Sequence, residues 1–273
     1  MKFKDLIFYP LRKLKKVVQL LIIEINEFIY PEKIRCKDLI NTYQKCNLKN
    51  SRNENIKFLD DVLESLGFKK YSELNGFYSE HLIIFAAIAK SDYKINNILE
   101  IGTHNGRTAS ILSRLFPKAN ITTIDLEDNN PTFKKTYKRD TNFKSFIKNR
   151  NKLISQHKNI TFLQMNSLKL SLANNKIPEQ DLIWVDGAHG YPIVSADITN
   201  SIKLMKKKSI LMCDDIWKKT KINDDMYVSN AGYETLLSFE EAKILKTYFF
   251  RKRIGKKFNG NYKFISFSEL FRD

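Results

Sequence analysis

Cysteine is scarce in this sequence, and the few cysteines present are not spaced as metal ligands or as disulfide partners. There are three among 273 residues, Cys36, Cys46 and Cys213, and no two of them form a C-x-x-C pair. The disulfide frameworks of secreted domains and the common structural zinc sites both need more cysteines at paired spacings. The sequence therefore predicts neither, and a reducing, cytoplasmic compartment fits it best.

A membrane-spanning hydrophobic run is also missing. The apolar stretch at residues 17–30 has about 14 residues and contains Glu24 and Glu27, whereas a spanning helix needs roughly 20 apolar residues. No small-residue cleavage site follows it, so we expect no signal peptide. A basic cluster precedes it at residues 12–16. Two alternatives stay open: an amphipathic helix that contacts the inner membrane surface or a partner, or a helix that packs on its own domain or on a second copy in a homo-oligomer.

Acidic residues are outnumbered in this chain. There are 47 Lys and Arg against 30 Asp and Glu, which gives a formal net charge of +17. The excess is mostly lysine scattered among asparagine and isoleucine, and lysine lacks the planar fork with which arginine recognises phosphate. We therefore do not expect nucleic acid as a partner. Hydrophobic residues make up 42% of the chain, which indicates a packed core rather than disorder.

Extended and helical patterns alternate from about residue 79 onward. Residues 33–75 are polar and predict a helical cap, and a helix follows over residues 82–88. Strands are predicted near 97–101, 121–125, 160–164, 181–186 and 208–213, with two closing strands at 244–250 and 262–267. Strands separated by helices indicate an α/β fold with a parallel sheet and right-handed crossovers. We place a helical extension at residues 1–75 and the main domain at residues 76–273.

The most informative segment is a strand that runs straight into a glycine turn, at residues 97–108. Gly102 allows a sharp turn where a β-carbon would collide with a ligand, and Gly106 lets the next helix pack closely with its free N–H groups facing the site. This arrangement predicts a nucleotide-like cofactor, although glycine turns also serve as plain connections in α/β proteins. The spacing differs from the dinucleotide pattern G-x-G-x-x-G, because the second glycine follows the first by four positions.

The next predicted strand ends in a carboxylate. Asp125 stands 23 positions after Gly102, close to the offset of about 20 at which a carboxylate accepts hydrogen bonds from ribose hydroxyls. An aspartate at a strand end is otherwise usually a turn former. The distance from the glycine turn favours the ribose role.

Three more carboxylates follow the fourth and fifth predicted strands. Asp186 comes directly after the fourth strand, and Asp214 and Asp215 come directly after the fifth. If these strands are neighbours, the three side chains meet, and like charges repel unless a cation lies between them. Oxygen ligands at this density suit Mg²⁺ or a similar divalent ion. The alternative is that one carboxylate caps the next helix while another faces solvent.

The pattern Glu100-x-Gly102-x-x-x-Gly106 resembles the first motif of the class I S-adenosylmethionine-dependent methyltransferases, and the resemblance covers about residues 75–270. It implies a Rossmann-like, seven-stranded, mostly parallel sheet with an antiparallel last strand. It implies S-adenosylmethionine as the cofactor, held by Glu100, Gly102, Thr103, Gly106, Asp125, Asn166 and Ser167. Many members have an acidic residue where Asn166 stands. Residues 206–208 are lysines where the family usually has Pro-Gly-Gly, so we expect altered loop geometry there.

The three carboxylates are similar to those of the metal-dependent small-molecule O-methyltransferases, which include catechol and macrolide-sugar enzymes. The string Asp186-Gly187-x-His189-x-Tyr191 resembles a branch found in glycan and natural-product clusters. The resemblance implies methyl transfer to a hydroxyl of a small molecule, a sugar or glycan component, with a divalent ion on Asp186, Asp214 and Asp215. Asp186 and His189 are the catalytic candidates, and residues 227–234 are predicted to form one wall of the acceptor pocket.

A histidine base alone is weak for this chemistry. An alkyl hydroxyl with a pKa of about 15.7 facing a histidine with a pKa of about 6.5 leaves a gap of about 9 units, on the order of 12 kcal/mol. A divalent ion on the hydroxyl would stabilise the alkoxide as it forms, and His189 would accept a proton already loosened. The alternative for His189 is a hydrogen bond within its own turn.

Two other function classes stay open. A nucleic-acid (RNA) methyltransferase would exploit the positive charge, but amino-methylating members have Asn/Asp-Pro-Pro-aromatic after the fourth strand, where this chain has Asp186-Gly187-Ala188-His189. The other class is a non-catalytic assembly protein that binds the cofactor.

Overall fold

The computed structural model describes residues 18, 37–73, 77–136, 142–172, 177–218, 229–253 and 261–271. The predictions for residues 1–30 therefore lie almost entirely outside the described residues, as do those for residues 227 and 228 of the predicted acceptor wall. Within these ranges no helix has the length and apolar character to cross a membrane.

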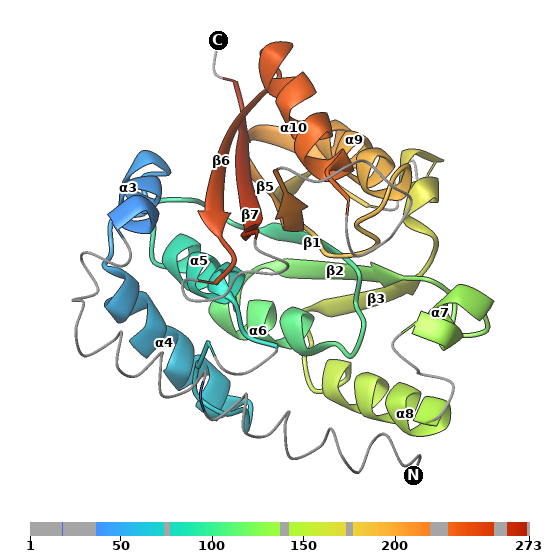
Figure 1. The fold of residues 1–273 in the computed structure, drawn as a ribbon. Helices are drawn as coiled ribbons and strands as arrows, with labels where there is room; N and C mark the ends of the chain where they lie inside the picture. The colour runs from blue at the N-terminus through green and yellow to red at the C-terminus, as the bar shows by residue number, and fades with distance from the viewer. Residues whose placement is uncertain are drawn as a thin grey trace.

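A seven-stranded sheet forms the centre of the protein (Figure 1). The strands are β1 (Asn97–Ile101), β2 (Asn120–Asp125), β3 (Ile160–Gln164), β4 (Gln180–Val185), β5 (Met205–Trp217), β6 (Leu245–Arg251) and β7 (Lys263–Leu270). Their order is β3-β2-β1-β4-β5-β7-β6, with β1 to β5 paired in parallel and β7 antiparallel to both β5 and β6. The predicted α/β fold with an antiparallel last strand is confirmed.

Helices cover both faces of this sheet. They are α3 (Lys37–Lys45), α4 (Arg52–Ser65), α5 (Glu80–Ala89), α6 (Arg107–Leu115), α7 (Pro131–Lys135), α8 (Phe143–Ile154), the 3-10 helix η2 (Ser167–Leu172), α9 (Ile193–Leu204) and α10 (Ala231–Glu241). In Figure 1, α9 and α10 lie on one side of the sheet, while α4, α5 and α6 lie on the other.

Alternating side chains of the central strands belong to two hydrophobic clusters, one on each face of the sheet. On β4, Leu182 and Trp184 pack with α5 and α6, while Ile183 and Val185 pack with α9 and α10. Every residue of β4 is buried, as expected for a parallel strand covered on both faces. The carboxyl ends of the parallel strands therefore meet at one edge of the sheet, where ligands bind in open α/β folds.

The helical extension packs into one of these clusters. Leu39 of α3 and Leu59 and Leu63 of α4 are buried in the same cluster as Phe250 of β6 and Phe267 of β7. Ser51 begins α4 with a capping box to Glu54, which satisfies two backbone donors at the helix start. Helices are thus confirmed within residues 33–75, and the domain boundary at residue 75 stays a prediction.

A buried ion pair connects the extension to the end of β6. Arg52 donates from Nε and Nη2 to the two carboxylate oxygens of Glu80, each at 2.9 Å, and the Tyr43 hydroxyl donates to Glu80 Oε1 at 2.8 Å. Glu80 is fully buried, so these donors replace its lost hydration. The backbone N–H of Glu80 donates to the carbonyl oxygen of Lys252 at 3.0 Å. The first turn of α5 therefore holds the chain in place where β6 ends.

We expect Arg52→Ala to lower the free energy of unfolding by about 3 to 5 kcal/mol, because it leaves the Glu80 carboxylate buried without its main counter-charge. Lys49→Ala is the matched control, since Lys49 pairs with Asp92 at 2.7 Å on the surface and should cost no more than about 1 kcal/mol. Urea unfolding followed by circular dichroism measures both. Equal losses in the two variants would contradict this account.

Candidate active site

A cavity of about 1340 Å³ opens at the carboxyl ends of β1, β2, β4 and β5. Ligand pockets of ordinary size measure about 300 to 1000 Å³, so this one has room for two ligands side by side. Of the predicted cofactor and catalytic residues, the following line it: Gly102, Thr103, Asp125, Asn166, Ser167, Asp186 and His189. Asp214, Asp215 and Lys252 line it as well.

The glycine turn between β1 and α6 packs against the chain itself. Gly102 has φ +107°, and a β-carbon there would lie 2.3 Å from the backbone carbonyl oxygen of Asp186. Within the chain, the nearest neighbour of such a β-carbon is therefore the turn after β4, and the role of Gly102 toward a ligand stays a prediction. Asp186 N–H also donates to the Ile101 carbonyl at 2.8 Å. A β-carbon at Gly106 would lie 2.9 Å from the Ile154 side chain, so this glycine lets α6 approach α8, as predicted.

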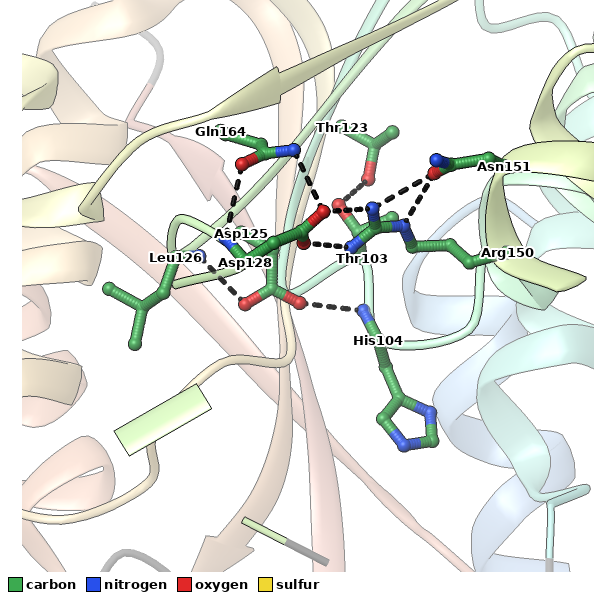
Figure 2. Close-up of polar contacts among 9 residues, drawn as sticks. All are labelled: Thr103, His104, Thr123, Asp125, Leu126, Asp128, Arg150, Asn151 and Gln164. Carbon is green, nitrogen blue, oxygen red and sulfur yellow. Dashed lines mark hydrogen bonds and ion pairs between the residues drawn. The ribbon is translucent and has the colours of Figure 1, made fainter. Parts of the chain in front are cut away.

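Asp125 ends β2 with its carboxylate fixed by backbone donors, as Figure 2 shows. His104 N–H donates to Oδ2 and Leu126 N–H donates to Oδ1, both at 2.8 Å. The hydroxyls of Thr103 and Thr123 share a hydrogen bond of 2.6 Å, which ties the glycine turn to β2. The carboxylate is therefore preorganised at the cavity wall, and its ribose role stays a prediction.

A second acidic residue near Asp125 has a buried arginine partner. Arg150 of α8 donates to Asp128 from Nη1 at 2.7 Å and from Nη2 at 2.9 Å, and Gln164 of β3 donates to the same carboxylate at 3.1 Å (Figure 2). Arg150 is fully buried, with its guanidinium 4.5 Å from the centre of the Phe162 ring. The pair holds α8 against β2 and β3, and both Arg150 and α8 line the cavity. Arg150 lies in a lysine-rich helix, and the sequence carries no signal for its pairing.

Glu100 and Gly106, two of the predicted cofactor residues, are not part of the cavity wall. Glu100 lies on β1 beneath the glycine turn and is only 1% exposed. The Thr123 hydroxyl donates to its Oε2 at 2.5 Å, and its Oε1 has no partner among the described residues. Burial raises the pKa of Glu100 to about 8, and the charge of Asp125 adds to this, while the Thr123 hydrogen bond partly opposes it. Glu100 is therefore a largely neutral, buried acid at pH 7.

The aspartates at the end of β5 are brought together by a bulge. Between Cys213 and Ile216 the register with β7 shifts by one residue, and Asp215 has φ +53°. In a regular strand, Asp214 and Asp215 would point to opposite faces. The bulge re-aims their side chains, so that both carboxylates contact the same lysine.

That lysine is Lys252, which follows β6. Its Nζ donates to Asp214 Oδ2 at 2.5 Å and to Asp215 Oδ1 at 2.6 Å, and Lys263 Nζ donates to Asp215 Oδ2 at 2.6 Å. All four side chains are largely buried, with exposed fractions of 6 to 16%. Although burial opposes it, the two ammonium groups hold the pKa of Asp215 well below its usual value. The sequence carries no signal for these lysines, which lie far along the chain from the aspartates that they contact.

The residues at this corner do not fit the predicted divalent ion. Among the described residues no group of three or more Asp, Glu, His or Cys side chains could hold a metal. Asp214 and Asp215 direct three of their four oxygens at ammonium groups, and the fourth, Asp214 Oδ1, is buried. The structure therefore does not support a metal on Asp186, Asp214 and Asp215.

Asp186 and His189 face the same cavity from the turn after β4. His189 Nε2 lies 3.6 Å from Asp186 Oδ1, and the Asp186 side chain keeps 31% of its exposure. Burial lowers the pKa of His189, although Asp215 and Asp214 oppose this. Desolvation, with the nearby Asp214 carboxylate, raises the pKa of Asp186. His189 is therefore a neutral imidazole at pH 7, able to accept a proton.

The donors and acceptors of the cavity fit S-adenosylmethionine. The fixed Asp125 carboxylate can accept from ribose hydroxyls, and the N-terminal end of α6, where Arg107 N–H donates to Asn105 Oδ1 at 3.1 Å, suits the carboxylate of the methionine end. Asn166 and Ser167, at the end of β3, offer a small polar pair for the adenine. Each of these groups lines the same cavity.

Comparison with known proteins agrees with this geometry. A protein-family model described as a methyltransferase domain matches residues 99–216, which run from β1 through most of β5. Over these residues the chain is similar to a methyltransferase domain. The match to the methyltransferase domain includes the glycine turn, Asp125, the Asp186 turn and the two aspartates of β5. No curated protein matches the chain in sequence.

The fold of the protein is similar to that of solved structures. A candidate O-methyltransferase from Klebsiella pneumoniae aligns with a TM-score of 0.50 and 11% identity, over 80% of this chain and 90% of that one. The O-methyltransferase TomG from Streptomyces achromogenes, solved with S-adenosylmethionine, aligns with a TM-score of 0.49 and 14% identity, over 82% and 92% of the two chains. At these identities the likeness concerns the fold alone.

Gly102→Ala should destabilise the protein by about 2 kcal/mol or more beyond Gly67→Ala, and should abolish binding of S-adenosylhomocysteine. Both glycines have positive φ, so both variants carry backbone strain, but a β-carbon at Gly67 meets nothing within 4 Å. The added cost at Gly102 is the clash with the Asp186 carbonyl. Thermal unfolding and calorimetric titration with S-adenosylhomocysteine measure the two effects. Equal destabilisation and intact binding would show that the close contact is unimportant.

Because of Glu100, the free energy of unfolding should fall as pH rises from about 5 to 8. Its pKa of about 8 in the folded state exceeds the unfolded value of about 4.3, so the folded state binds more protons in that interval, and the slope reaches at most about 1.4 kcal/mol per pH unit. The stabilisation is fully present below the unfolded pKa and is lost as pH passes the folded pKa. Glu100→Gln should flatten the curve in urea unfolding at a series of pH values. An unchanged slope in that variant would refute the assignment.

Proposed function

We propose that the protein transfers the methyl group of S-adenosylmethionine to a hydroxyl of a small molecule. The observation that carries this proposal is the single cavity in which Gly102, Asp125 and Ser167 stand beside His189 and Lys252. A cofactor held by the first group of residues and an acceptor held near the second would share one enclosure, whose volume exceeds what one ligand needs.

The chain's own residues do the following work in this proposal. S-adenosylmethionine supplies a methyl group on a sulfonium sulfur, which keeps the electron pair of the broken C–S bond when the acceptor oxygen bonds to the methyl carbon. His189 takes the hydroxyl proton at its ring nitrogen, since burial keeps the imidazole neutral. Asp186 Oδ1 lies 3.6 Å from Nε2 of that ring, so the carboxyl group of Asp186 borders the nitrogen on that side. The walls of the cavity hold the acceptor in line, which supplies up to about 7 to 11 kcal/mol in favourable cases.

The acceptor is a sugar or another small polyol. This part of the proposal rests on the resemblance at residues 186–191, and its alternative is an RNA acceptor, for which the net positive charge is the supporting feature. No metal-assisted step is included, because Asp214 and Asp215 contact lysines.

Methyl transfer is tested with S-adenosylmethionine labelled in the methyl group and separate panels of sugars, polyols and RNA. We expect label in the hydroxyl-bearing small molecules and equal amounts of S-adenosylhomocysteine released. Label in RNA alone, or label in amines alone, would overturn the proposal.

His189→Gln should lower kcat by about 10² to 10⁴-fold, the usual effect of a lost general base, while the Kd for S-adenosylhomocysteine changes little. His157→Gln is the matched control, because His157 is a buried histidine that bonds Ser113 at 3.0 Å and does not line the cavity. Steady-state kinetics and calorimetry measure the two variants. Wild-type turnover in His189→Gln would exclude His189 as the base.

A further inference from the structure

The corner between β5, β6 and β7 holds an ammonium group where a divalent ion was predicted. Lys252 Nζ lies 2.5 Å from Asp214 Oδ2 and 2.6 Å from Asp215 Oδ1. Mg²⁺ sits about 2.1 Å from its oxygen ligands, so an ion bound by these two oxygens would overlap the ammonium nitrogen. The lysine and a divalent ion therefore exclude each other from this position.

The charges of the four side chains that pair at this corner already balance. Asp214 and Asp215 carry two negative charges, and Lys252 and Lys263 carry two positive charges, all in side chains at most 16% exposed. A divalent ion binds where carboxylates leave a negative surplus, because that surplus offsets the cost of removing the ion's water. At Asp214 and Asp215 two lysines have removed that surplus.

Lys252 is held by the fold on three sides. Its N–H donates to the Lys263 carbonyl at 2.9 Å, where β6 and β7 meet, and its carbonyl accepts from Glu80 N–H at 3.0 Å. Glu80 is itself fixed by Arg52 and Tyr43. The backbone of Lys252 is thus bonded to two elements, and its ammonium group is bonded to two carboxylates. Lys252 lines the same cavity as His189.

We propose that Lys252 is a built-in cation that takes the place of a divalent metal and orients the acceptor oxygen. Two of its N–H bonds point to Asp214 and Asp215, and the third is directed to the acceptor. Lys252 is a catalytic residue in this scheme: it donates a hydrogen bond to the oxygen whose proton passes to His189 and stabilises the negative charge that develops there. The part concerning the acceptor rests on the proposed function, whereas the exclusion of metal does not.

Binding of Mn²⁺ alone, followed by electron paramagnetic resonance, tests the exclusion without any acceptor. Wild-type protein should bind Mn²⁺ only weakly, and Lys252→Ala should bind one ion per chain about 10-fold or more tightly, because it exposes two carboxylates and removes one positive charge. Lys206→Ala is the matched control, since Lys206 pairs with Asp181 at 2.7 Å at the opposite ends of β4 and β5. It should bind Mn²⁺ no better than wild type.

Tight stoichiometric Mn²⁺ binding by the wild-type protein would overturn the proposal, and so would equal binding by wild type and Lys252→Ala. A cooperative thermal transition and retained binding of S-adenosylhomocysteine establish that the variant is folded. If Lys252→Ala does not fold, Lys252→Ser tests the same point, because serine leaves similar space and can bond one carboxylate.

Turnover tests the second half of the proposal. With a hydroxyl acceptor, wild-type kcat should be unchanged by EDTA, and Lys252→Ala should lose about 10² to 10³-fold in kcat, as when one donor to a developing oxyanion is removed. Loss of activity in EDTA that Mg²⁺ restores would contradict it. If no acceptor is methylated by the wild type, the proposed function fails, while the Mn²⁺ result still decides whether Lys252 occupies the cation position.

Discussion

Charged side chains buried at the carboxyl edge of the sheet need partners of opposite charge. The arrangement of the site depends on which residues supply those partners. Glu80 bonds Arg52, Asp128 bonds Arg150, and Asp215 bonds Lys252 and Lys263. A buried carboxylate without such a partner costs several kcal/mol or becomes protonated. Glu100 is largely protonated at pH 7, because burial raises its pKa to about 8. Because each partner comes from a different element, satisfying these charges also fixes the helices and the β6 end around the cavity.

The same pairing determines what chemistry the cavity supports. Methyl transfer to a hydroxyl needs a base for the proton and positive charge near the oxygen, because a histidine and an alkyl hydroxyl differ by about 9 pKa units. His189 is buried and neutral, so it can act as the base, and Lys252, which lines the same cavity, is the proposed source of positive charge. A cation that belongs to the chain does not depend on metal supply, but it is a weaker Lewis acid than a divalent ion and cannot be exchanged.

The strands, and the place of Gly102 and Asp125 at the cavity, could be predicted from the sequence because their determinants are local. The apolar runs mark β1 to β5 within a few residues, and the glycine turn at Gly102 and the carboxylate of Asp125 stand at fixed distances along one β-α-β unit. The acceptor side could be predicted only in part. Asp214 and Asp215 were predicted to meet at the end of β5, but the bulge that turns both toward one lysine has no local signal. Lys252, Lys263 and Arg150 are three among many basic residues, and only tertiary packing selects them.

The central claim is that one cavity holds S-adenosylmethionine beside a carboxylate corner filled by lysine. A crystal structure of the S-adenosylhomocysteine complex, grown with Mn²⁺ and measured at the manganese absorption edge, tests it most directly. We predict the ribose hydroxyls within hydrogen-bond distance of Asp125, the sulfur directed toward His189, and Lys252 Nζ between Asp214 and Asp215 with no anomalous peak there. An anomalous peak bound by Asp214 and Asp215 with Lys252 displaced, or the nucleoside bound outside this cavity, would contradict the account.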